Sequence, residues 1–595
     1  MPFFKKKEAA PDAGANSDAN SARTKVDDSY VPTEKPSLER DVDDVAAPPK
    51  VSGEGEKPAD APAADGAPDE TINYLTGTKL VVLIAALCLV IFLVALDQTI
   101  IAPALGAITA EFSSVKDIGW YGSAYFLTTT ALQPMFGNIY KRFSIKSSFL
   151  GAVFIFEVGS LICAVAQNST TFIVGRAVAG IGTAGMFSGG IIILANTMPL
   201  RQRPMAFGII SSMWGIASVA GPLLGGAFTD HVTWRWCFYI NLPVGALAMI
   251  TIFFVLHLKV ERNPKNLPLL SRILELDLPG TAIFLPAIIC LLLALQWGGT
   301  EYAWKSATII GLFCGFGGMI IIFIGIQFWQ GDNATLPPRF FKIKDLLVAM
   351  GFNFVFGAAF FPLVYYLSLY FQAIKGDSAV QAGIKLIPLL LAVVISSMLS
   401  GGLITYIGYY NFVVIPCMVL VAVGAGMLTT LDVDSPMRVW FGYQVLTGLG
   451  TGAGFQIGIL VAQTILSLDD IPVATACLQF FQALGSAIFI AVAQTLFQNG
   501  LIDGLTAEPT LTRLGVSPLV FINSGASQVR DILIKMGAEA AIPTVLEAYM
   551  TGIRNTFYIT VAAGVAAFLL ACALKIRSVK KPEGGNAAEQ PPAAV

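Results

Sequence analysis

Long runs of apolar residues follow one another along most of the chain, and short polar segments separate them. An α-helix needs about 20 mostly apolar residues to cross a bilayer. Fourteen runs reach that length, at 80–102, 118–140, 148–167, 171–196, 205–228, 236–258, 278–297, 306–329, 346–371, 382–405, 411–431, 438–466, 473–498 and 553–574. The pattern therefore predicts an all-α polytopic membrane protein with 14 transmembrane helices.

A faint internal repeat divides these runs into two sets. A Gly-bearing helix end and turn occur at 137–144 and again at 402–408, and Pro-x-Ala opens a run at 204–206 and again at 472–474. Two six-helix halves are a plan of membrane transporters. We assign an N-terminal half at 79–258, two inserted helices with flanking cytoplasmic loops at 259–345, and a C-terminal half at 346–575 that contains a long extracellular loop at 499–552.

The chain ends differ in composition from the apolar region. Residues 1–78 are rich in charged residues and Pro and poor in aromatic residues, so they cannot form a core and are predicted to be a disordered cytoplasmic tail. Residues 576–595 form a second cytoplasmic tail. The whole chain is 55% hydrophobic and 13% charged, against about 25% charged in soluble domains, which excludes an ordinary soluble enzyme. A net charge of −2 without a basic stripe excludes a nucleic-acid partner.

Basic residues in short loops predict the orientation, because Lys and Arg accumulate on the cytoplasmic side. They gather in every second loop and after the last run: Lys141, Arg142, Lys146; Arg201, Arg203; Lys259, Arg262, Lys265, Arg272; Arg339, Lys342, Lys344; Lys575, Arg577, Lys580 and Lys581. Both termini are therefore predicted to face the cytoplasm. We expect the plasma membrane, with a vacuolar or vesicle membrane as the alternative.

Three charged residues stand inside apolar runs. A charge in that position is costly unless it is paired or reaches water, so such residues are candidates for function. Asp97 is a candidate proton or substrate site, or else a residue at the outer interface. Arg176 is a candidate counter-charge, or else reaches the interface with its long side chain. Glu157 is a candidate for proton coupling, or else a structural partner of a neighbouring helix.

Four segments resemble motifs of the major facilitator superfamily, in its fourteen-span drug:proton antiporter branch of fungal toxin and multidrug efflux pumps. They are Leu96-Asp97-Gln-Thr-Ile-Ile101, Arg176-x-x-x-Gly180-x-Gly182, Gly221-Pro222-x-x-Gly225-Gly226, and Trp234-Arg-Trp-Cys-Phe-Tyr-Ile-Asn-Leu-Pro243. The resemblance covers about 80–575. It implies export of a small organic molecule in exchange for protons, with the proton gradient as energy source and no other cofactor.

The same resemblance assigns roles to residues. It implies proton coupling by Arg176, places Asp97 in the family's span-1 motif, and implies a conformational role for Gly221, Pro222, Gly225 and Gly226. Gly137 and Arg142 fall on the family's loop between helices 2 and 3, where Lys141 replaces the usual acidic residue. That replacement removes the carboxylate expected at the cytoplasmic gate, and the basic residues of this loop then serve only to set the topology.

Neutral amides and aromatic residues of the C-terminal half predict the substrate cavity. Flat apolar contacts with a few hydrogen bonds suit a large, uncharged ligand. We select Tyr365, Tyr366, Gln372, Gln456, Gln479 and Gln482 as candidates; the alternative is that amides of this kind join neighbouring helices.

Other functions and partners fit less well. No phosphate-binding loop, Gly-x-Ser-x-Gly or metal-ligand spacing occurs in the apolar region, and the eight Cys are expected to be packing residues. We therefore predict no enzyme, no metal and a monomer. The alternative function is proton-coupled uptake of a ferric siderophore or a sugar. Asn168 is a candidate glycosylation site in an outer loop.

Overall fold

The structure is a computed structural model, and it describes residues 75–112, 117–257, 276–299, 302–506 and 529–579. These residues form helices and no β-strand. The predicted disorder of 1–78 and the tail at 576–595 lie almost entirely outside the described residues, as do most of the loop at 259–276 and the middle of the loop at 499–552.

Thirteen helices of the described residues are long and apolar enough to cross a membrane. They are α1 (Thr78–Thr99), α4 (Ile145–Val165), α5 (Ser169–Thr197), α6 (Arg203–His231), α7 (Trp236–Tyr239) with α8 (Asn241–Val255), α10 (Leu278–Trp297), α11 (Ala307–Gln330), α13 (Lys344–Leu369), α15 (Ile387–Ile407), α16 (Asn411–Leu428), α17 (Met437–Thr451) with α18 (Gly454–Ile465), α19 (Ile471–Thr506) and α23 (Ile542–Ala573). The prediction of an all-α polytopic membrane protein is thereby confirmed.

The helix α3 (Ile118–Arg142) occupies the place of the second predicted span but is less apolar than the others. Its polar side chains bond to neighbouring helices: Thr128 donates to the Ala177 carbonyl and Thr129 to the Gly180 carbonyl of α5. Because this helix does not reach the apolarity of the other thirteen, the count of 14 stays a prediction.

Two predicted loops and one predicted helix differ in the structure. After α1 the chain forms a further helix, α2 (Ile101–Phe112). The predicted loop at 499–552 is wrong at both ends, because α19 continues to Thr506 and α23 already begins at Ile542. Apolar residues of these extensions, such as Leu501 and Val545, are buried and hold the helical form. The predicted helix at 438–466 is interrupted between α17 and α18, where Gly452 lies against the backbone of α15.

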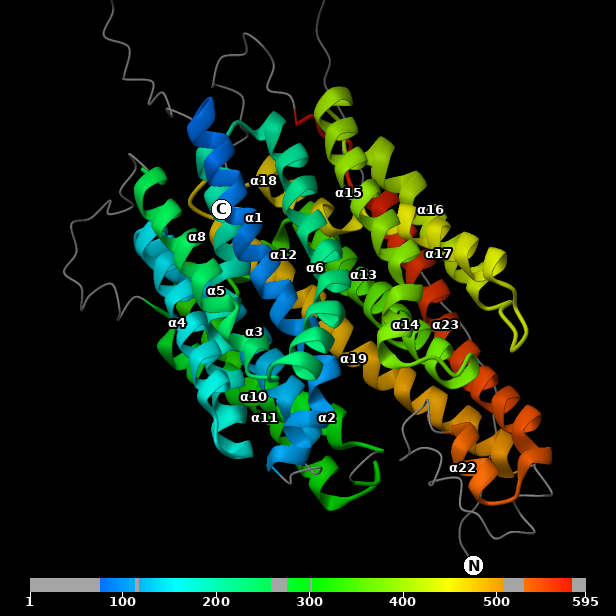
Figure 1. The fold of residues 1–595 in the computed structure, drawn as a ribbon. Coiled ribbons are helices and arrows are strands. Elements are labelled where there is room, and N and C mark those ends of the chain that lie inside the picture. Colours follow the sequence, from blue (N-terminus) through cyan, green and yellow to red (C-terminus); the bar gives the residue numbers. More distant parts are fainter. Residues whose placement is uncertain (1–74, 113–116, 258–275, 300–301, 507–528, 580–595) are drawn as a thin grey trace, which may run out of the picture. The chain divides into compact units, whose positions relative to one another are not determined.

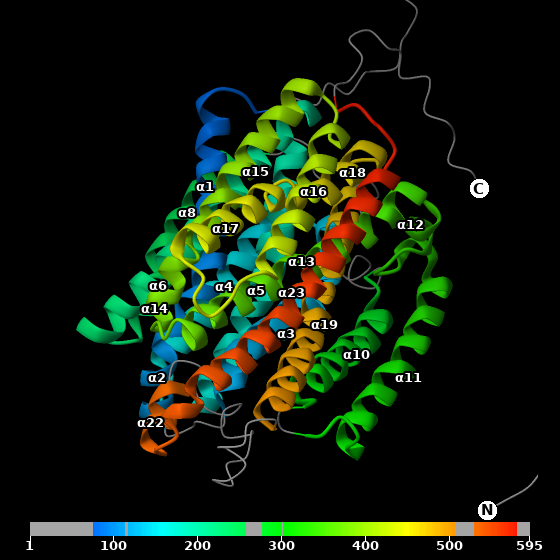
Figure 2. The ribbon, with the colours of Figure 1, turned by 90° about the vertical axis from the view of Figure 1, so that its right-hand side faces the viewer.

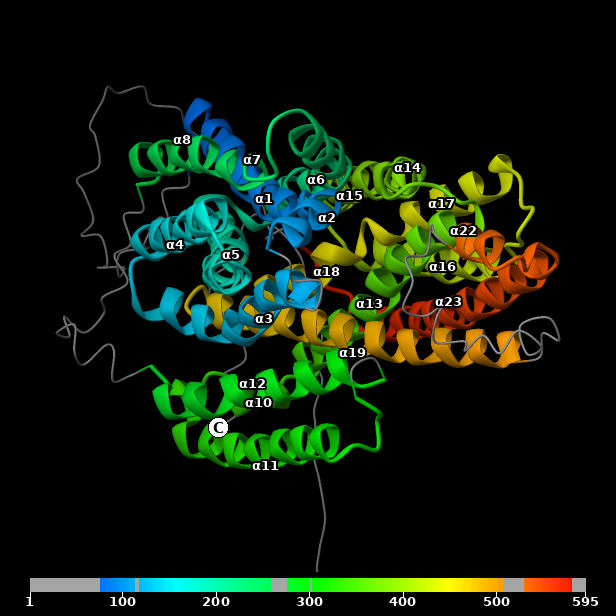
Figure 3. The ribbon, with the colours of Figure 1, turned by 60° about the horizontal axis from the view of Figure 1, so that its bottom comes forward.

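The helices form two groups with an added pair beside them. In Figure 1, α4, α5 and α8 lie on the left and α16, α17 and α23 on the right. The groups meet where α6 packs on α15 and where α3 packs on α19. The inserted helices α10 and α11 pack on each other, and α10 contacts α3 and α19; Figures 2 and 3 show the pair beside these two helices.

The two contacts between the groups use equivalent residues of the faint repeat. A Cβ at Gly137 of α3 would lie 3.0 Å from the Val473 Cα and 3.1 Å from the Pro472 carbonyl oxygen of α19. A Cβ at Gly401 of α15 would contact the Pro204 carbonyl oxygen and lie 3.2 Å from the Met205 Cα of α6. The counterpart of Gly137 is therefore Gly401, one residue before the predicted match. At both places a glycine allows the backbones of two helices to approach closely.

Candidate transport site

Asp97 and Arg176 form a buried ion pair inside the first group of helices. Their side chains are 0% and 1% exposed, and Arg176 Nη1 donates to Asp97 Oδ2 at 2.6 Å. The guanidinium also donates to the Tyr121 carbonyl at 2.9 Å and lies over the Tyr125 ring, 4.5 Å from its centroid. Asn241 Nδ2 donates to the second oxygen, Asp97 Oδ1, at 3.3 Å. The structure thus brings two of the three predicted coupling residues into contact, and places Asp97 in the interior.

Glu157 of α4 is the third predicted coupling residue and stands apart from this pair. Its side chain is buried, and neither carboxyl oxygen has a hydrogen-bond partner in the described residues. One turn along the same helix, Ser160 accepts a hydrogen bond from Asn241 Nδ2 at 3.1 Å. An ionised carboxylate without a partner is costly in a buried place.

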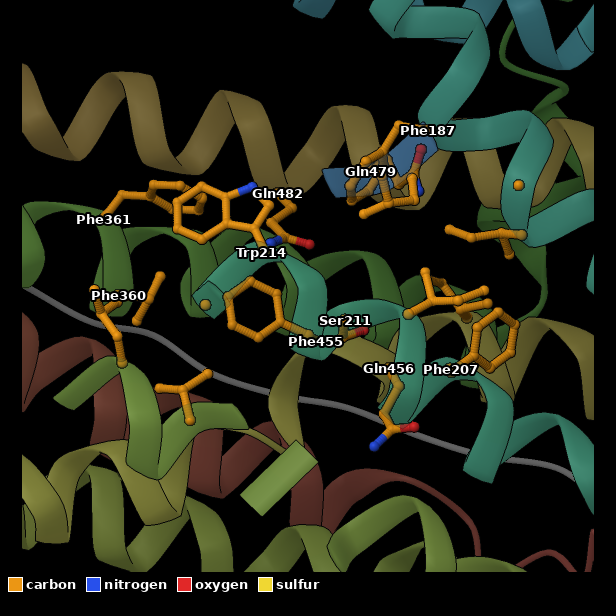
Figure 4. A pocket seen from close by; sticks show the side chains of 18 residues that line it. Phe187, Phe207, Ser211, Trp214, Phe360, Phe361, Phe455, Gln456, Gln479 and Gln482 are labelled. Carbon is orange, nitrogen blue, oxygen red and sulfur yellow. The ribbon is translucent and has the colours of Figure 1, made fainter. Parts of the chain in front are cut away.

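A cavity lies between the two groups of helices. It is lined by Ile91, Phe187, Gly190, Ile191, Phe207, Ile210, Ser211, Trp214, Gly215, Phe360, Phe361, Leu390, Val393, Phe455, Gln456, Ile459, Gln479 and Gln482. The empty space between these residues, its open mouth included, is about 920 Å³. Figure 4 shows aromatic rings and amides from α6, α13, α18 and α19 around it. None of the lining side chains is charged.

Three of the six residues predicted to line the substrate cavity do so: Gln456, Gln479 and Gln482. The other three do not. Tyr365 of α13 is 58% exposed and is not among the residues that line the cavity, and Tyr366 of the same helix packs on Phe497. Gln372 lies in the π-helical turn after α13 and donates to Ser368. Tyr365 lies one turn beyond Phe361 on the same face of α13, and the helix carries it past the part that lines the cavity.

The prediction missed the contribution of the N-terminal half. Phe207, Ser211 and Trp214 of α6 line the cavity, and Trp214 lies edge-on to Phe361 with ring centroids 6.0 Å apart. Positions 207, 211 and 214 recur at the spacing of one helix face. That periodicity could have predicted the contribution of α6, because aromatic residues on one face of a Gly-rich helix are candidates for contact with a ligand.

Amides also join the two groups beside the cavity. Gln479 Oε1 accepts a hydrogen bond from Gln133 of α3 at 3.0 Å and another from Ser188 of α5 at 2.9 Å. Gln456 donates to the Ser397 carbonyl and to Ser400 of α15. The two interpretations of the amides, cavity lining and links between helices, therefore hold for the same residues.

A charge cluster joins the groups at the end of the bundle that carries Lys141, Arg142, Arg203 and Arg339, which we call the basic end. Lys141 Nζ lies 3.0 Å from Asp470 Oδ1, just before α19. Lys141 does replace the family's acidic residue, but the expectation that the basic residues of this loop serve only to set the topology is wrong, because Asp470 of the opposite half pairs with Lys141. Sequence reasoning missed Asp470, since acidic residues count little in the prediction of topology.

The glycines of the predicted antiporter motif let α6 approach α1. A Cβ at Gly221 would overlap Thr99, and a Cβ at Gly225 would overlap the carbonyl of Ile100, where α1 ends. Pro222 lies inside α6 near Gly383, whereas a Cβ at Gly226 would make only an ordinary contact with Val380, at 3.9 Å. These contacts show tight packing; the conformational role of the motif stays a prediction.

Asn168 caps α5, because its side chain accepts a hydrogen bond from the Thr171 N–H at 2.8 Å. The residue is exposed. Its glycosylation stays a prediction.

Comparison with known proteins gives the family. Residues 87–490 match the model of the Major Facilitator Superfamily. The MFS-type efflux pump MFS1 of Trichophyton rubrum is 46% identical over 512 residues, which are 86% of this chain and 94% of the relative. The efflux pump roqT of Penicillium rubens is 44% identical over 530 residues, 89% of this chain and 96% of the relative. The rubrofusarin-specific efflux pump aurT of Gibberella zeae is 41% identical over 513 residues, 86% of this chain and 92% of the relative.

A solved structure shares the fold. The proton:xylose symporter XylE, bound to 6-bromo-6-deoxy-D-glucose, matches with a TM-score of 0.54 and 12% identity, over 84% of this chain and 97% of that protein. The curated relatives and the family match together settle the class of protein. The chain belongs to the major facilitator superfamily and is a multi-pass membrane transporter of small molecules, not an enzyme.

Proposed function

We propose that this transporter exports an uncharged, largely apolar organic molecule, such as a secondary metabolite, toxin or drug, from the cytoplasm in exchange for protons. The observation that carries the proposal is the separation of two kinds of site. The cavity between the groups has no charged lining residue, whereas the buried charges Asp97 and Arg176 lie inside the first group. The substrate and the proton can then bind to different residues of the same protein.

The cavity lining supports the substrate class. Phe361, Trp214 and Phe455 supply flat apolar surface, and Gln456, Gln479, Gln482 and Ser211 are the polar side chains among the 18 that line the cavity. Mostly apolar pockets with a few placed polar groups suit aromatic organic ligands. A sugar or a ferric siderophore, the alternative substrates of an uptake transporter, needs many more hydrogen-bonding groups. The names of the relatives as efflux pumps support export.

Proton coupling is assigned to Asp97, with Arg176 and Asn241 as its partners. In the paired state the charge of Arg176 compensates the charge of Asp97 at 2.6 Å. A proton that binds Asp97 removes the attraction to Arg176, so the pair separates and a different arrangement of the helices becomes favourable. Glu157, buried without a hydrogen-bond partner in the part of the chain that the structure describes, is proposed as a second proton carrier. The proton gradient is then the only energy source.

The position of the basic residues supports an orientation of the protein in the membrane. Lys141, Arg142 and Arg339 lie at one end of the bundle, and Asp470 contacts two of them there. We place this basic end in the cytoplasm together with both termini, because cytoplasmic loops carry an excess of Lys and Arg. We further propose the plasma membrane as location and a monomer as the working unit.

The test uses inverted plasma-membrane vesicles from cells that express the full chain. Acidified vesicle lumens should drive uptake of the neutral aromatic dye Nile red, and a protonophore should abolish the uptake. Vesicles without the protein serve as control. Accumulation that requires an acid exterior instead would indicate symport and overturn the export mechanism, while accumulation of radiolabelled glucose but not of the dye would overturn the substrate class.

A further inference from the structure

Asp470 at the basic end is shared by two cations that come from different parts of the chain. Lys141 of α3 approaches Asp470 Oδ1 to 3.0 Å, and Arg339 Nη2 approaches the same oxygen to 2.6 Å. The Asp470 side chain is 14% exposed, against 22% for Lys141 and 40% for Arg339. A carboxylate at the start of a helix is also stabilised by the helix dipole, and Asp470 directly precedes α19. Asp470 is therefore stabilised by Lys141, by Arg339 and by the dipole of α19.

The two cations belong to different groups of helices. Lys141 ends α3 in the first group. Arg339 lies in α12 (Pro338–Lys342), which packs on α13 of the second group, and α19 with Asp470 also packs on α13. If the two groups separate at the basic end, Lys141 leaves Asp470, whereas Arg339 stays beside it.

The inserted helices hold the segment that precedes Arg339. Asp277, at the start of α10, is 1% exposed and accepts hydrogen bonds from the Gly280 N–H, from Gln327 and Gln330 of α11, and from the Thr335 N–H at 2.9 Å. Gln327 in turn accepts from the Leu336 N–H at 2.8 Å. A buried carboxylate with this many donors fixes the backbone after α11.

This fixed backbone is the surface that the end of α3 contacts. Arg142 Nη2 donates to Asn333 Oδ1 at 3.2 Å, and Asn138 Nδ2 donates to the Ala334 carbonyl at 3.4 Å. The inserted pair thus contributes to the closed basic end in two ways. The loop after α11 contacts the end of α3, and the same loop leads directly into α12, which carries Arg339.

We propose that the inserted helix pair is part of the gate at the basic end, in which Lys141 is the exchangeable partner of Asp470 and Arg339 is its resident partner. Arg339 keeps Asp470 compensated when Lys141 leaves. Removing one partner from a buried ion pair otherwise leaves an uncompensated charge, which opposes separation. Arg339 therefore makes the gate easier to open, while Lys141 holds it closed. The proposal concerns the conformational equilibrium of the protein alone and requires neither substrate nor protons.

The test measures opening of the basic end with a buried cysteine. Val473 is 1% exposed, lies three residues after Asp470 and contacts Gly137 of α3. Val473→Cys, in a full-length chain whose eight native cysteines are replaced, is reacted with N-ethylmaleimide in lipid nanodiscs without substrate. Lys141→Gln should raise the reaction rate about three- to fivefold, the range of a partly exposed ion pair. Arg339→Gln should lower the rate by a similar factor, and Arg339→Lys should restore it.

Arg201→Gln is the matched control, because Arg201 is an exposed cation at the same end without an ion pair among the described residues; its reaction rate should stay at the starting value. Asp277→Asn should raise the reaction rate of the cysteine, because the backbone after α11 that contacts α3 is then held less firmly. Gel filtration of each variant separates a shifted equilibrium from unfolding. If Arg339→Gln raises the rate as Lys141→Gln does, Arg339 is an additional closing contact and the proposal is overturned; unchanged rates in both variants overturn it as well.

Discussion

Glu157 lies directly against the backbone of Gly245, so closely that a methyl group at position 245 would overlap its carboxyl group. The contact joins α4 to α8 one turn from Asn241, the residue that bonds to both Asp97 and Ser160. The glycine therefore provides the space that the unpartnered carboxyl group occupies.

Gly245→Ala should displace the Glu157 carboxyl group, because overpacking a buried site costs about 1–3 kcal/mol. We expect proton-driven accumulation of the dye to fall, and we expect a smaller fall in Glu157→Gln. Gly151→Ala in the same helix as Glu157 is the control, since a Cβ there meets no atom within 4 Å. Accumulation at the normal rate in Gly245→Ala would show that the position of Glu157 does not matter.

Asp97→Asn should remain folded and bind the dye but lose proton-driven accumulation, because an amide still reaches Arg176 and Asn241 but takes up no proton. The measurement is dye uptake by inverted vesicles with an acid lumen, alongside dye binding to the purified variant. Active accumulation by this variant would make Asp97 a structural residue.

Arg176→Ala should abolish accumulation and also lower the stability of the protein. It leaves Asp97 charged and unpaired at 0% exposure, and breaking a buried pair in this way costs about 3–5 kcal/mol. The double variant Asp97→Asn with Arg176→Ala should regain part of that stability in thermal unfolding. Equal stability of the single and double variants would contradict the energetic role of the pair.

Phe361→Ala should raise the KM for Nile red about fivefold, because an aromatic contact contributes about 1 kcal/mol beyond the buried area. Tyr365→Ala, one turn further along the same face of α13 but outside the cavity lining, should change KM much less. Initial uptake rates over a range of dye concentrations measure both. A larger effect at Tyr365 than at Phe361 would place the substrate outside the cavity.

Single cysteines test the orientation. Ser144→Cys lies between α3 and α4 at the basic end, and Asp434→Cys lies between α16 and α17 at the opposite end; both positions are exposed. In intact cells an impermeant maleimide should label only Asp434→Cys. Labelling of Ser144→Cys alone would reverse the topology.

The apolar runs predict most of the helices, because a helix that crosses lipid requires a long apolar segment. Few other structures require such a segment. The ends of α19 and α23 escape this rule. Residues such as Leu501 and Tyr549 extend these helices by packing on other helices of the protein, at positions where polar residues interrupt the apolar run. Their length depends on tertiary contacts that a count of apolar residues does not contain.

The charged residues of the candidate site are predictable, because few charged residues occur in the apolar runs. Asp97 and Arg176 are isolated charges in apolar runs, so each requires a partner and few partners exist. The aromatic residues are abundant instead. Phe361 lines the cavity, whereas Tyr365, one turn further along the same face of α13, does not; the apolar pattern does not show where along the helix the cavity lies. Asp470 gives no signal of its own, since its importance arises from the approach of Lys141 and Arg339.

The polar character of α3 has a consequence for the order in which the protein is made. Thr128 and Thr129 obtain their partners from α5, which is synthesised soon after α3. Gln133 obtains its partner, Gln479, only when α19 follows, near the end of translation. Until then α3 carries an unsatisfied amide at a place that later becomes dry. An N-terminal half made without the second half would therefore leave the Gln133 amide nitrogen without its Gln479 partner.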